Sequence, residues 1–198
     1  INGQCVMDRN HQIIKRHNLN KADIVRLLDL CLEHEIALGV KCSSQIVCLH
    51  DCAKFQKHYG HGEDPAGRYL DAEKNPDILD KDPGMGLFLV GDVQKIIDRM
   101  DQFPQWDHAR AFAWGMDLYD KDVHKSKGIE DVMEILGLTW DEVMVFGDAD
   151  NDLRMISKAG IGIAMGNATE KLKKTADYVT SDLTDDGIYK ALKHFKLI

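Results

Sequence analysis

The last third of the chain alternates short apolar runs with helical patterns, and this alternation constrains the fold more than any other feature. Residues 143–146 and 161–165 are continuous apolar runs of the length expected for buried strands. A helical pattern lies between them, and another, over residues 126–136, is bounded by Ser126 as the expected N-cap and Gly137 as the expected C-cap. Strands and helices alternating at this spacing form parallel β-α-β units, so we predict an α/β fold.

The first part of the chain mixes strands and helices less regularly. Two β-prone runs, at residues 4–7 and 12–16, flank a polar turn and predict a hairpin. After Asn20, an expected N-cap, apolar residues recur at helical spacing over residues 24–31. Further strands are expected at residues 36–40, 46–49, 87–90 and 109–114, with a helix at 93–100. Residues 53–84 carry no assignable pattern, and the region as a whole is typical of a small α/β domain.

The charge balance excludes two classes of partner. Lysine and arginine number 25 against 33 aspartates and glutamates, so the formal net charge is −8. Such a chain lacks the basic stripe that binds nucleic acid or an anionic membrane, and neither is expected as a partner. No signal-peptide pattern and no apolar run of membrane-span length is present. Five cysteines without the spacing of a disulfide framework favour a reducing, cytoplasmic location.

The segment from Phe146 to Asp152 places several polar groups where a buried strand ends and a helix begins. Ligands of open α/β sheets bind at the carboxyl ends of the strands. Carboxylates in such a turn suit Mg²⁺, which prefers oxygen ligands, and the N-terminus of the following helix favours phosphate. One aspartate alone would be interpreted as a helix cap, but the cluster of Asp148, Asp150 and Asn151 with Asp152 favours a phosphate-handling site.

A lysine near the start of the preceding helix is a second candidate. Lys127 is expected in the first turn, where the helix dipole disfavours a cation by a few tenths of a kcal/mol, roughly. A nearby phosphate or carboxylate would offset that cost. A solvated surface lysine is an equally good interpretation of this position alone.

Five motifs occur in order along the last third of the chain: Ser126-Lys127-Gly128, Gly147-Asp148-x-x-Asn151-Asp152, the run from Gly162 to Ala168, Ala176-Asp177-Tyr178-Val179 and Asp186-Gly187. Together they resemble the Cof-type phosphatases of the haloacid dehalogenase (HAD) superfamily, the subclass with a large α/β cap. The resemblance implies the C-terminal half of a HAD Rossmann-like parallel sheet core with an inserted α/β cap domain. Residues 1–19 would be a hairpin remnant of the core, residues 20–115 the cap, and residues 116–198 the C-terminal half of the core.

The resemblance also implies roles for four residues. Lys127 would neutralise the substrate phosphate and the aspartyl nucleophile, and Asn151 would contact the phosphate. Asp148 would bind Mg²⁺, and Asp152 would support the metal through water or through another ligand. The family hydrolyses phosphomonoesters through an aspartyl-phosphate, so the expected substrates are small phosphorylated metabolites such as sugar phosphates.

The nucleophile motif of that family, Asp-x-Asp-x-(Thr/Val) at the end of a strand, has no counterpart here. Asp148-Ala149-Asp150 is the only Asp-x-Asp that follows an apolar strand, and it belongs to the later motif. The chain also does not begin with Met, so we expect the nucleophile in a missing N-terminal segment of the same protein. The chain alone would then be inactive, with unpaired strand edges around Val145 and Ile163.

Other functions remain open. A zinc site could use Cys48 and Cys52 with neighbouring cysteines and histidines, among them His61, but only that one pair has typical spacing. P-type ATPases carry similar motifs but need membrane helices, which this sequence lacks. The third alternative is a non-catalytic binding or regulatory fragment, which the missing nucleophile favours.

Overall fold

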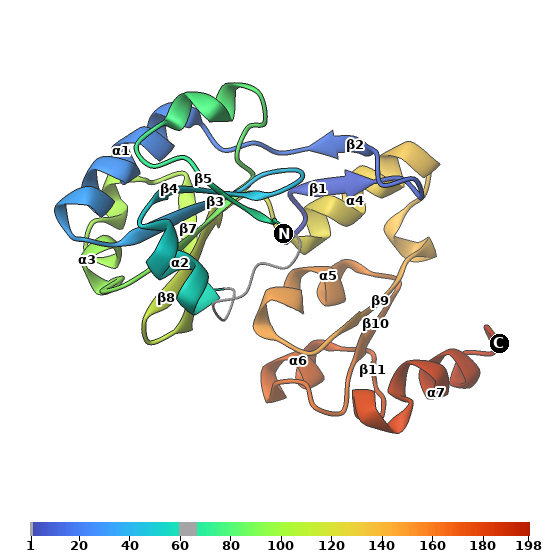
Figure 1. The fold of residues 1–198 in the computed structure, drawn as a ribbon. Coiled ribbons are helices and arrows are strands. Elements are labelled where there is room, and N and C mark those ends of the chain that lie inside the picture. Colours follow the sequence, from blue (N-terminus) through green and yellow to red (C-terminus); the bar gives the residue numbers. More distant parts are fainter. Residues whose placement is uncertain (1, 60–66) are drawn as a thin grey trace. The chain divides into compact units, whose positions relative to one another are not determined.

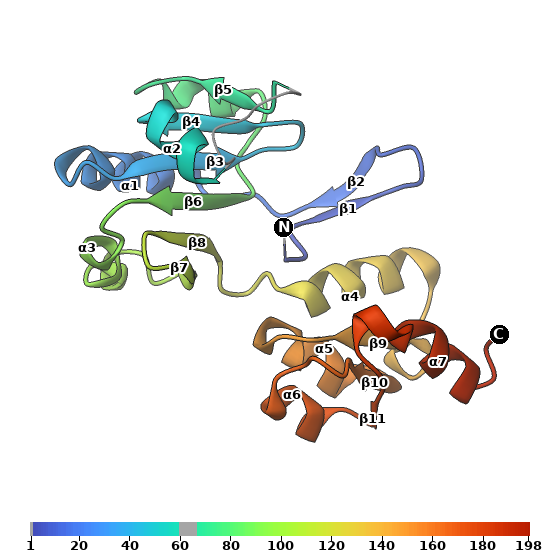
Figure 2. The ribbon, with the colours of Figure 1, turned by 60° about the horizontal axis from the view of Figure 1, so that its bottom comes forward.

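The computed structural model describes residues 2–59 and 67–198, which divide into two compact units. Unit 1 contains residues 3–123, and unit 2 contains residues 124–198 together with Asn2. Figures 1 and 2 show the elements of each unit from two directions. Each unit has a sheet and an apolar core of its own.

Unit 1 is built around a six-stranded sheet. Its strands are β3 (Ala37–Lys41), β4 (Ile46–His50), β5 (Tyr69–Asp71), β6 (Gly86–Val90), β7 (Trp106–Phe112) and β8 (Gly115–Asp120). The strand order is β5-β4-β3-β6-β8-β7. β4 and β5 are parallel, and the other neighbouring strands are antiparallel. The central strands β3 and β6 are buried almost throughout, which requires cover on both faces of the sheet.

Helices provide that cover. α1 (Lys21–Glu33) packs on one face of the sheet, and α2 (Cys52–Tyr59) packs on the other (Figure 2). Side chains of successive strand residues point to opposite faces. Leu38 therefore joins the core on the α1 side, while its neighbour Ala37 joins the cluster on the α2 side.

A hairpin precedes the sheet of unit 1, as predicted. β1 (Cys5–Met7) pairs antiparallel with β2 (Ile13–Arg16). The remaining elements of unit 1 are the short helix α3 (Gln94–Ile97) and two 3-10 turns, Pro76–Asp80 and Met100–Gln102. The helix expected at residues 93–100 is thus confined to one turn and a separate 3-10 segment.

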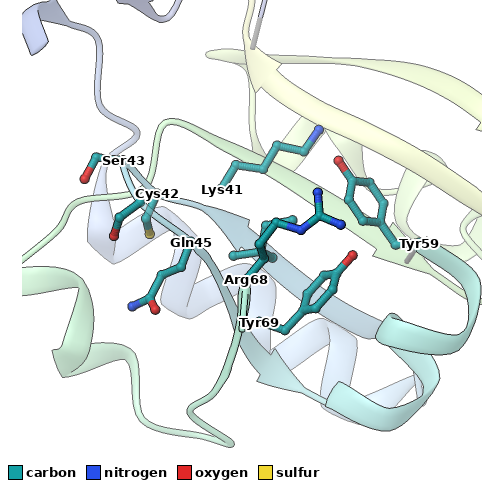
Figure 3. A pocket seen from close by; sticks show the side chains of 9 residues that line it. Lys41, Cys42, Ser43, Gln45, Tyr59, Arg68 and Tyr69 are labelled. Atoms are coloured by element: carbon teal, nitrogen blue, oxygen red, sulfur yellow. The ribbon is translucent and has the colours of Figure 1, made fainter. Parts of the chain in front are cut away.

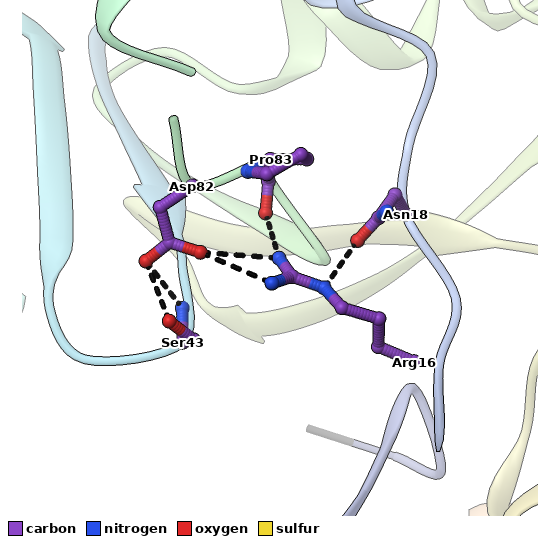
Figure 4. A network of polar contacts seen from close by, with 5 residues as sticks. All are labelled: Arg16, Asn18, Ser43, Asp82 and Pro83. Carbon is purple, nitrogen blue, oxygen red and sulfur yellow. Dashed lines mark hydrogen bonds and ion pairs between the residues drawn. The ribbon is translucent and has the colours of Figure 1, made fainter. Parts of the chain in front are cut away.

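A polar cluster ties the end of the hairpin to the loops beside the sheet (Figure 4). Both terminal nitrogens of Arg16 donate to Asp82 Oδ1 at 3.2 Å, and Nε donates to Asn18 Oδ1 at 2.6 Å. Arg16 also donates to the carbonyl of Pro83 at 2.5 Å. The other oxygen of Asp82 accepts from Ser43 N at 3.0 Å and from Ser43 Oγ at 2.7 Å. Asp82 therefore joins three segments that are far apart in the sequence.

Unit 2 contains a three-stranded parallel sheet in the order β11-β10-β9, which confirms the predicted β-α-β pattern. Its elements are α4 (Lys125–Leu136), β9 (Met144–Gly147), α5 (Leu153–Lys158), β10 (Ile161–Ala164), α6 (Glu170–Thr175), β11 (Tyr178–Val179) and α7 (Gly187–His194). The core of unit 2 joins Val145 of β9 to Ile156 of α5 and Leu172 of α6.

The start of α4 differs from the sequence prediction. His124, and not Ser126, is the N-cap, because His124 Nδ1 accepts from the backbone N–H of Lys127 at 3.2 Å. Ser126 lies inside the helix, fully buried, with its hydroxyl 2.6 Å from the same His124 nitrogen. Gly137 ends the helix with φ 68°, which confirms the predicted C-cap.

The strand expected at residues 109–114 is one arm of a longer hairpin. β7 and β8 pair antiparallel on either side of residues 113–114. The domain limit expected at residue 115 falls inside this hairpin, and unit 1 extends to Val123. β8 lies between β6 and β7 and pairs with both, which holds it in the sheet of unit 1 despite its charged residues.

The expectation of two unpaired strand edges is half wrong. β10, which carries Ile163, pairs on both sides and is the central strand of its sheet. Within the described residues, β9 pairs only with β10, so the edge at Val145 is the one left open.

The cysteines contribute to packing. None of the five, all of which are described, forms a disulfide, and four of them are buried. Residues 2–59 and 67–198 contain no group of three metal-ligating side chains, and the zinc candidate His61 lies outside these residues. In the described part of the chain, no helix combines the length and the apolar character needed to cross a membrane.

Replacing Asp82 should destabilise unit 1 in a pH-dependent way. Burial raises the pKa of Asp82, but hydrogen bonds from Ser43 and Arg16 outweigh this effect and hold the pKa below its usual value. A carboxylate with a lowered folded-state pKa contributes stability at neutral pH that is lost as the pH falls below about 4. We expect Asp82→Asn to lower the free energy of unfolding by about 1–2 kcal/mol at pH 7, and by less at acidic pH.

The measurement is urea unfolding followed by the fluorescence of Trp106 and Trp114, with Trp140 replaced by Phe in every protein compared. The exposed Asp29 supplies a matched control, and Asp29→Asn should change stability by less than about 0.5 kcal/mol. Equal unfolding free energies for the two variants at pH 7 would contradict the role given to Asp82.

Candidate active site

A cavity of about 230 Å³ lies in unit 2 at the carboxyl ends of β9 and β10. Its lining includes Lys125, Gly147, Asp148, Asp152 and Asn167. These residues come from the start of α4, from the end of β9 and the turn after it, and from the loop after β10. The carboxyl end of a parallel sheet is where α/β proteins bind ligands, so this cavity is the candidate site.

Asp152 is the buried centre of this site. Only 1% of the residue is exposed. Its Oδ2 accepts from the backbone N–H groups of Asp148 at 3.0 Å and Ala149 at 3.3 Å. Its Oδ1 lies 2.5 Å from Lys125 Nζ. One carboxylate therefore closes the turn after β9 and holds a lysine from another helix beside it.

Glycine is required at the end of β9. A Cβ at Gly147 would lie 2.6 Å from Cβ of Asp152 and 2.9 Å from its Oδ2. Such contacts would push the carboxylate away from the two amides that it accepts. Gly147 thus allows the chain to turn tightly over the Asp152 side chain.

Asp148 presents its carboxylate at the cavity. The residue is exposed, and its Oδ2 accepts from Asn167 Nδ2 at 3.4 Å. Its backbone carbonyl accepts from Thr169 N at 3.1 Å, and Thr169 Oγ1 donates to Asp150 Oδ1 at 2.8 Å. The loop after β10 therefore fixes the turn after β9 from the other side. Asn167 is a site residue that sequence reasoning did not select, although its position directly after the apolar run 161–165 is a signal that could have identified it.

The structure does not bring Lys127 to this cavity. Its Nζ lies 3.0 Å from Oδ1 of Asp131, one turn further along α4. Lys125 and Lys127 are two residues apart, so they project about 200° apart around the helix axis. Placing the N-cap at Ser126 instead of His124 moves the expected first turn two residues along the chain, and for that reason sequence reasoning selected Lys127 and missed Lys125.

Asn151 lies beside the site and is not among the residues that line the cavity. It is exposed, and its Nδ2 is 3.4 Å from Oδ1 of Asn2. Of the four predicted site residues, the structure therefore brings Asp148 and Asp152 together at the cavity. Asn151 follows in the same turn, and Lys127 faces elsewhere.

The arrangement offers one ammonium group and one exposed carboxylate to a ligand. Both oxygens of Asp152 already accept hydrogen bonds, which leaves Asp148 as the carboxylate available for a cation. The described residues contain no cluster of three acids that would enclose a metal ion unaided. Chemically, the site suits a phosphate beside Lys125, with Asp148 as one oxygen ligand of a Mg²⁺ ion.

The family of the chain follows from its match to known proteins. The profile of the haloacid dehalogenase-like hydrolases matches residues 1–192. The match includes both units, so the chain belongs to this family. Its α/β fold is the HAD Rossmann-like fold with a cap domain.

Individual relatives agree with this family. Over 75 residues the chain is 45% identical to 5-amino-6-(5-phospho-D-ribitylamino)uracil phosphatase YcsE of Bacillus subtilis, a match that spans 38% of this chain and 30% of that enzyme. The structure of the HAD phosphatase BT1666 from Bacteroides thetaiotaomicron matches the whole chain with a TM-score of 0.82 and 26% identity. The subclass IIB sugar phosphatase BT4131 matches 96% of the chain with a TM-score of 0.74 and 24% identity, a likeness of fold. The chain covers 72% of each of these two structures and less than a third of YcsE.

Removing the Asp152 carboxylate should destabilise unit 2 strongly. Asp152→Ala leaves two amides without their acceptor and Lys125 without its counter-charge, so we expect a loss of about 3 kcal/mol in the free energy of unfolding. Asp150→Ala removes one exposed hydrogen bond and should cost less than about 1 kcal/mol. Urea unfolding followed by Trp140 fluorescence, with Trp106 and Trp114 replaced by Phe in every protein compared, measures both. Similar losses for the two variants would show that Asp152 does not organise the turn.

Proposed function

We propose that this chain supplies the cap and the C-terminal part of the core of a phosphomonoester hydrolase that acts on small phosphorylated metabolites such as sugar phosphates. The observation that carries the proposal is the shared cavity of Lys125 and Asp148 at the carboxyl end of β9. YcsE is named for a phosphorylated ribityl compound and BT4131 as a sugar phosphatase, and both names support this substrate class. Residues 20–123 would form the cap, with residues 1–19 and 124–198 belonging to the core; the expected limit at residue 115 moves to residue 123 because β8 pairs within the sheet of unit 1.

Lys125 takes the phosphate-binding role that the family resemblance implies for Lys127. Its ammonium group is held at the cavity by Asp152, where it can neutralise the negative charge of a phosphate and of an attacking carboxylate. Asn151 would contact the same phosphate by a small movement of its exposed side chain. Lys127, already paired with the buried Asp131, would stabilise α4.

Asp148 is the residue that would bind Mg²⁺, and Asp152 would hold Asp148 in place through its backbone N–H. A bound Mg²⁺ would polarise the phosphoryl oxygens and offset their charge. Mg²⁺ is commonly held by one or two carboxylates together with substrate phosphate and water. Unit 2 supplies one available carboxylate, that of Asp148, so a second carboxylate from outside unit 2 would complete the site.

The covalent step needs a carboxylate nucleophile, which we propose lies in a segment outside these 198 residues. Its oxygen would attack phosphorus, the ester P–O bond would break with release of the alcohol, and water would then hydrolyse the acyl phosphate. The open edge of β9 supports this proposal, since a parallel strand pairing there would end beside Asp148. The chain alone would then bind phosphate without hydrolysing its esters.

The 198-residue chain should not hydrolyse p-nitrophenyl phosphate in the presence of Mg²⁺. The expected rate of p-nitrophenol release equals that of buffer alone, because the two carboxylates among the described lining residues, Asp148 and Asp152, are assigned to the metal and to the turn after β9, and neither acts as the nucleophile. Asp148→Asn serves as the control for contaminating phosphatases, whose activity the substitution would leave unchanged. Robust turnover that Asp148→Asn abolishes would refute the proposed location of the nucleophile.

Inorganic phosphate should bind the isolated chain weakly through Lys125. In ¹H–¹⁵N correlation spectra, titrated phosphate should shift the amide signals of residues 147–152. Lys125→Ala should weaken this binding about tenfold, because a charge-assisted hydrogen bond is lost, whereas Lys127→Ala should leave it within about twofold. The opposite ranking of the two variants would restore Lys127 as the phosphate-binding lysine.

A further inference from the structure

A second cavity, of about 300 Å³, lies in unit 1 between the β3–β4 turn, the end of α2 and the start of β5. Its size is within the range of small-molecule pockets. The lining includes Lys41, Gln45, Tyr59, Arg68 and Tyr69. Figure 3 shows the charged ends of Lys41 and Arg68 on the side of the cavity where the hydroxyls of the two tyrosines lie. We call it the Arg68 cavity.

The charged side chains among the described lining residues of the Arg68 cavity are both cationic. Lys41 and Arg68 line it, and none of the described lining residues is acidic, whereas the chain carries a net charge of −8. Lys41 is fixed by an ion pair with Asp117 of β8 and lies 5.6 Å from the ring centre of Tyr59. The position of Lys41 is therefore set by the fold, and Arg68 adds a cation that can donate to two oxygens of a carboxylate or a phosphate.

Aromatic packing holds the two phenols in place. Tyr59 stacks on Phe55 with 5.1 Å between ring centres, and Tyr69 meets the same Phe55 ring edge-on at 6.1 Å. Phe55 is fully buried, so it anchors both rings. Each tyrosine is half-buried and can present a hydroxyl donor to an anion and a ring surface to an organic group.

The backbone around the Arg68 cavity is hydrogen-bonded. The N–H of Ile46 donates to the carbonyl of Arg68 at 2.7 Å, where β4 and β5 begin to pair. The N–H of Cys42 donates to the carbonyl of Gln45 at 3.0 Å and closes the β3–β4 turn, in which Asp82 holds Ser43. Both walls therefore belong to regular, paired structure.

We infer that the Arg68 cavity binds a small organic anion, in which a phosphate or carboxylate group is attached to an apolar ring or a sugar. Arg68 and Lys41 would bind the anionic group, and Tyr59 and Tyr69 would contact the ring or sugar. The inference is independent of the proposed hydrolase activity, because every residue that carries it belongs to unit 1.

Titration of the full chain with phenylphosphonate, followed in ¹H–¹⁵N correlation spectra, tests the inference. We expect shifts of the amide signals of residues 42–46 and 68–69, and a dissociation constant lower than that of inorganic phosphate at the same signals. Benzyl alcohol, which has the ring without the charge, should produce no saturable shift there. If the cavity recognised only the anionic group, phenylphosphonate and phosphate would have equal dissociation constants. That result would contradict the role of the tyrosines.

Two arginine variants complete the test. Arg68→Gln should raise the dissociation constant of phenylphosphonate at these signals about tenfold, because a charge-assisted bidentate contact is lost. The exposed Arg9, in the β1–β2 turn, provides the matched control, and Arg9→Gln should leave the constant unchanged. Equal constants for the two variants, or shifts confined to residues 124–167, would overturn the inference. Amide signals away from the cavity should be the same in each variant as in the unsubstituted protein, which shows that the variant is folded.

Discussion

The candidate site depends on one buried carboxylate. Burying the charged carboxylate of Asp152 away from water costs several kcal/mol. Its contacts with the ammonium group of Lys125 and with the N–H groups of Asp148 and Ala149 offset that cost. The same contacts hold α4 against the turn after β9 and aim the Asp148 carboxylate at the cavity. Stability and site geometry therefore rest on the same interactions, and Gly147 gives the carboxylate the space that it needs.

The two cavities hold their lysines in the same way. Lys125 is paired with Asp152, and Lys41 is paired with Asp117, each partner coming from a different element. A lysine side chain has many rotamers, and ordering it costs up to about 2 kcal/mol, so a partner carboxylate that positions it in the free protein lowers the cost of ligand binding. Although the protein carries a net negative charge, each of these two lysines is positioned to bind an anion in its cavity.

Short-range patterns predicted the elements well, and long-range pairing explains where they did not. The parallel sheet of unit 2 follows from apolar runs separated by helical spacing, and those signals lie within about ten residues of each other. β8 (Gly115–Asp120) was not predicted, since its charged Asp117 is satisfied by Lys41, 76 residues away. The 3-10 turn Pro76–Asp80 and β5 similarly depend on contacts with α1 and β4 that no local pattern contains.

The sequence by itself determined the family motifs, the α/β class and the carboxylate-rich turn after β9, because each depends only on residues that are close together in the sequence. Only the tertiary structure decided which lysine serves that turn. Lys125 and Lys127 are equivalent in the sequence, but the cap formed by His124 sets the rotation of α4, and a helix turns by about 100° per residue. That rotation places Lys125 on Asp152, 27 residues further along the chain, and turns Lys127 to Asp131.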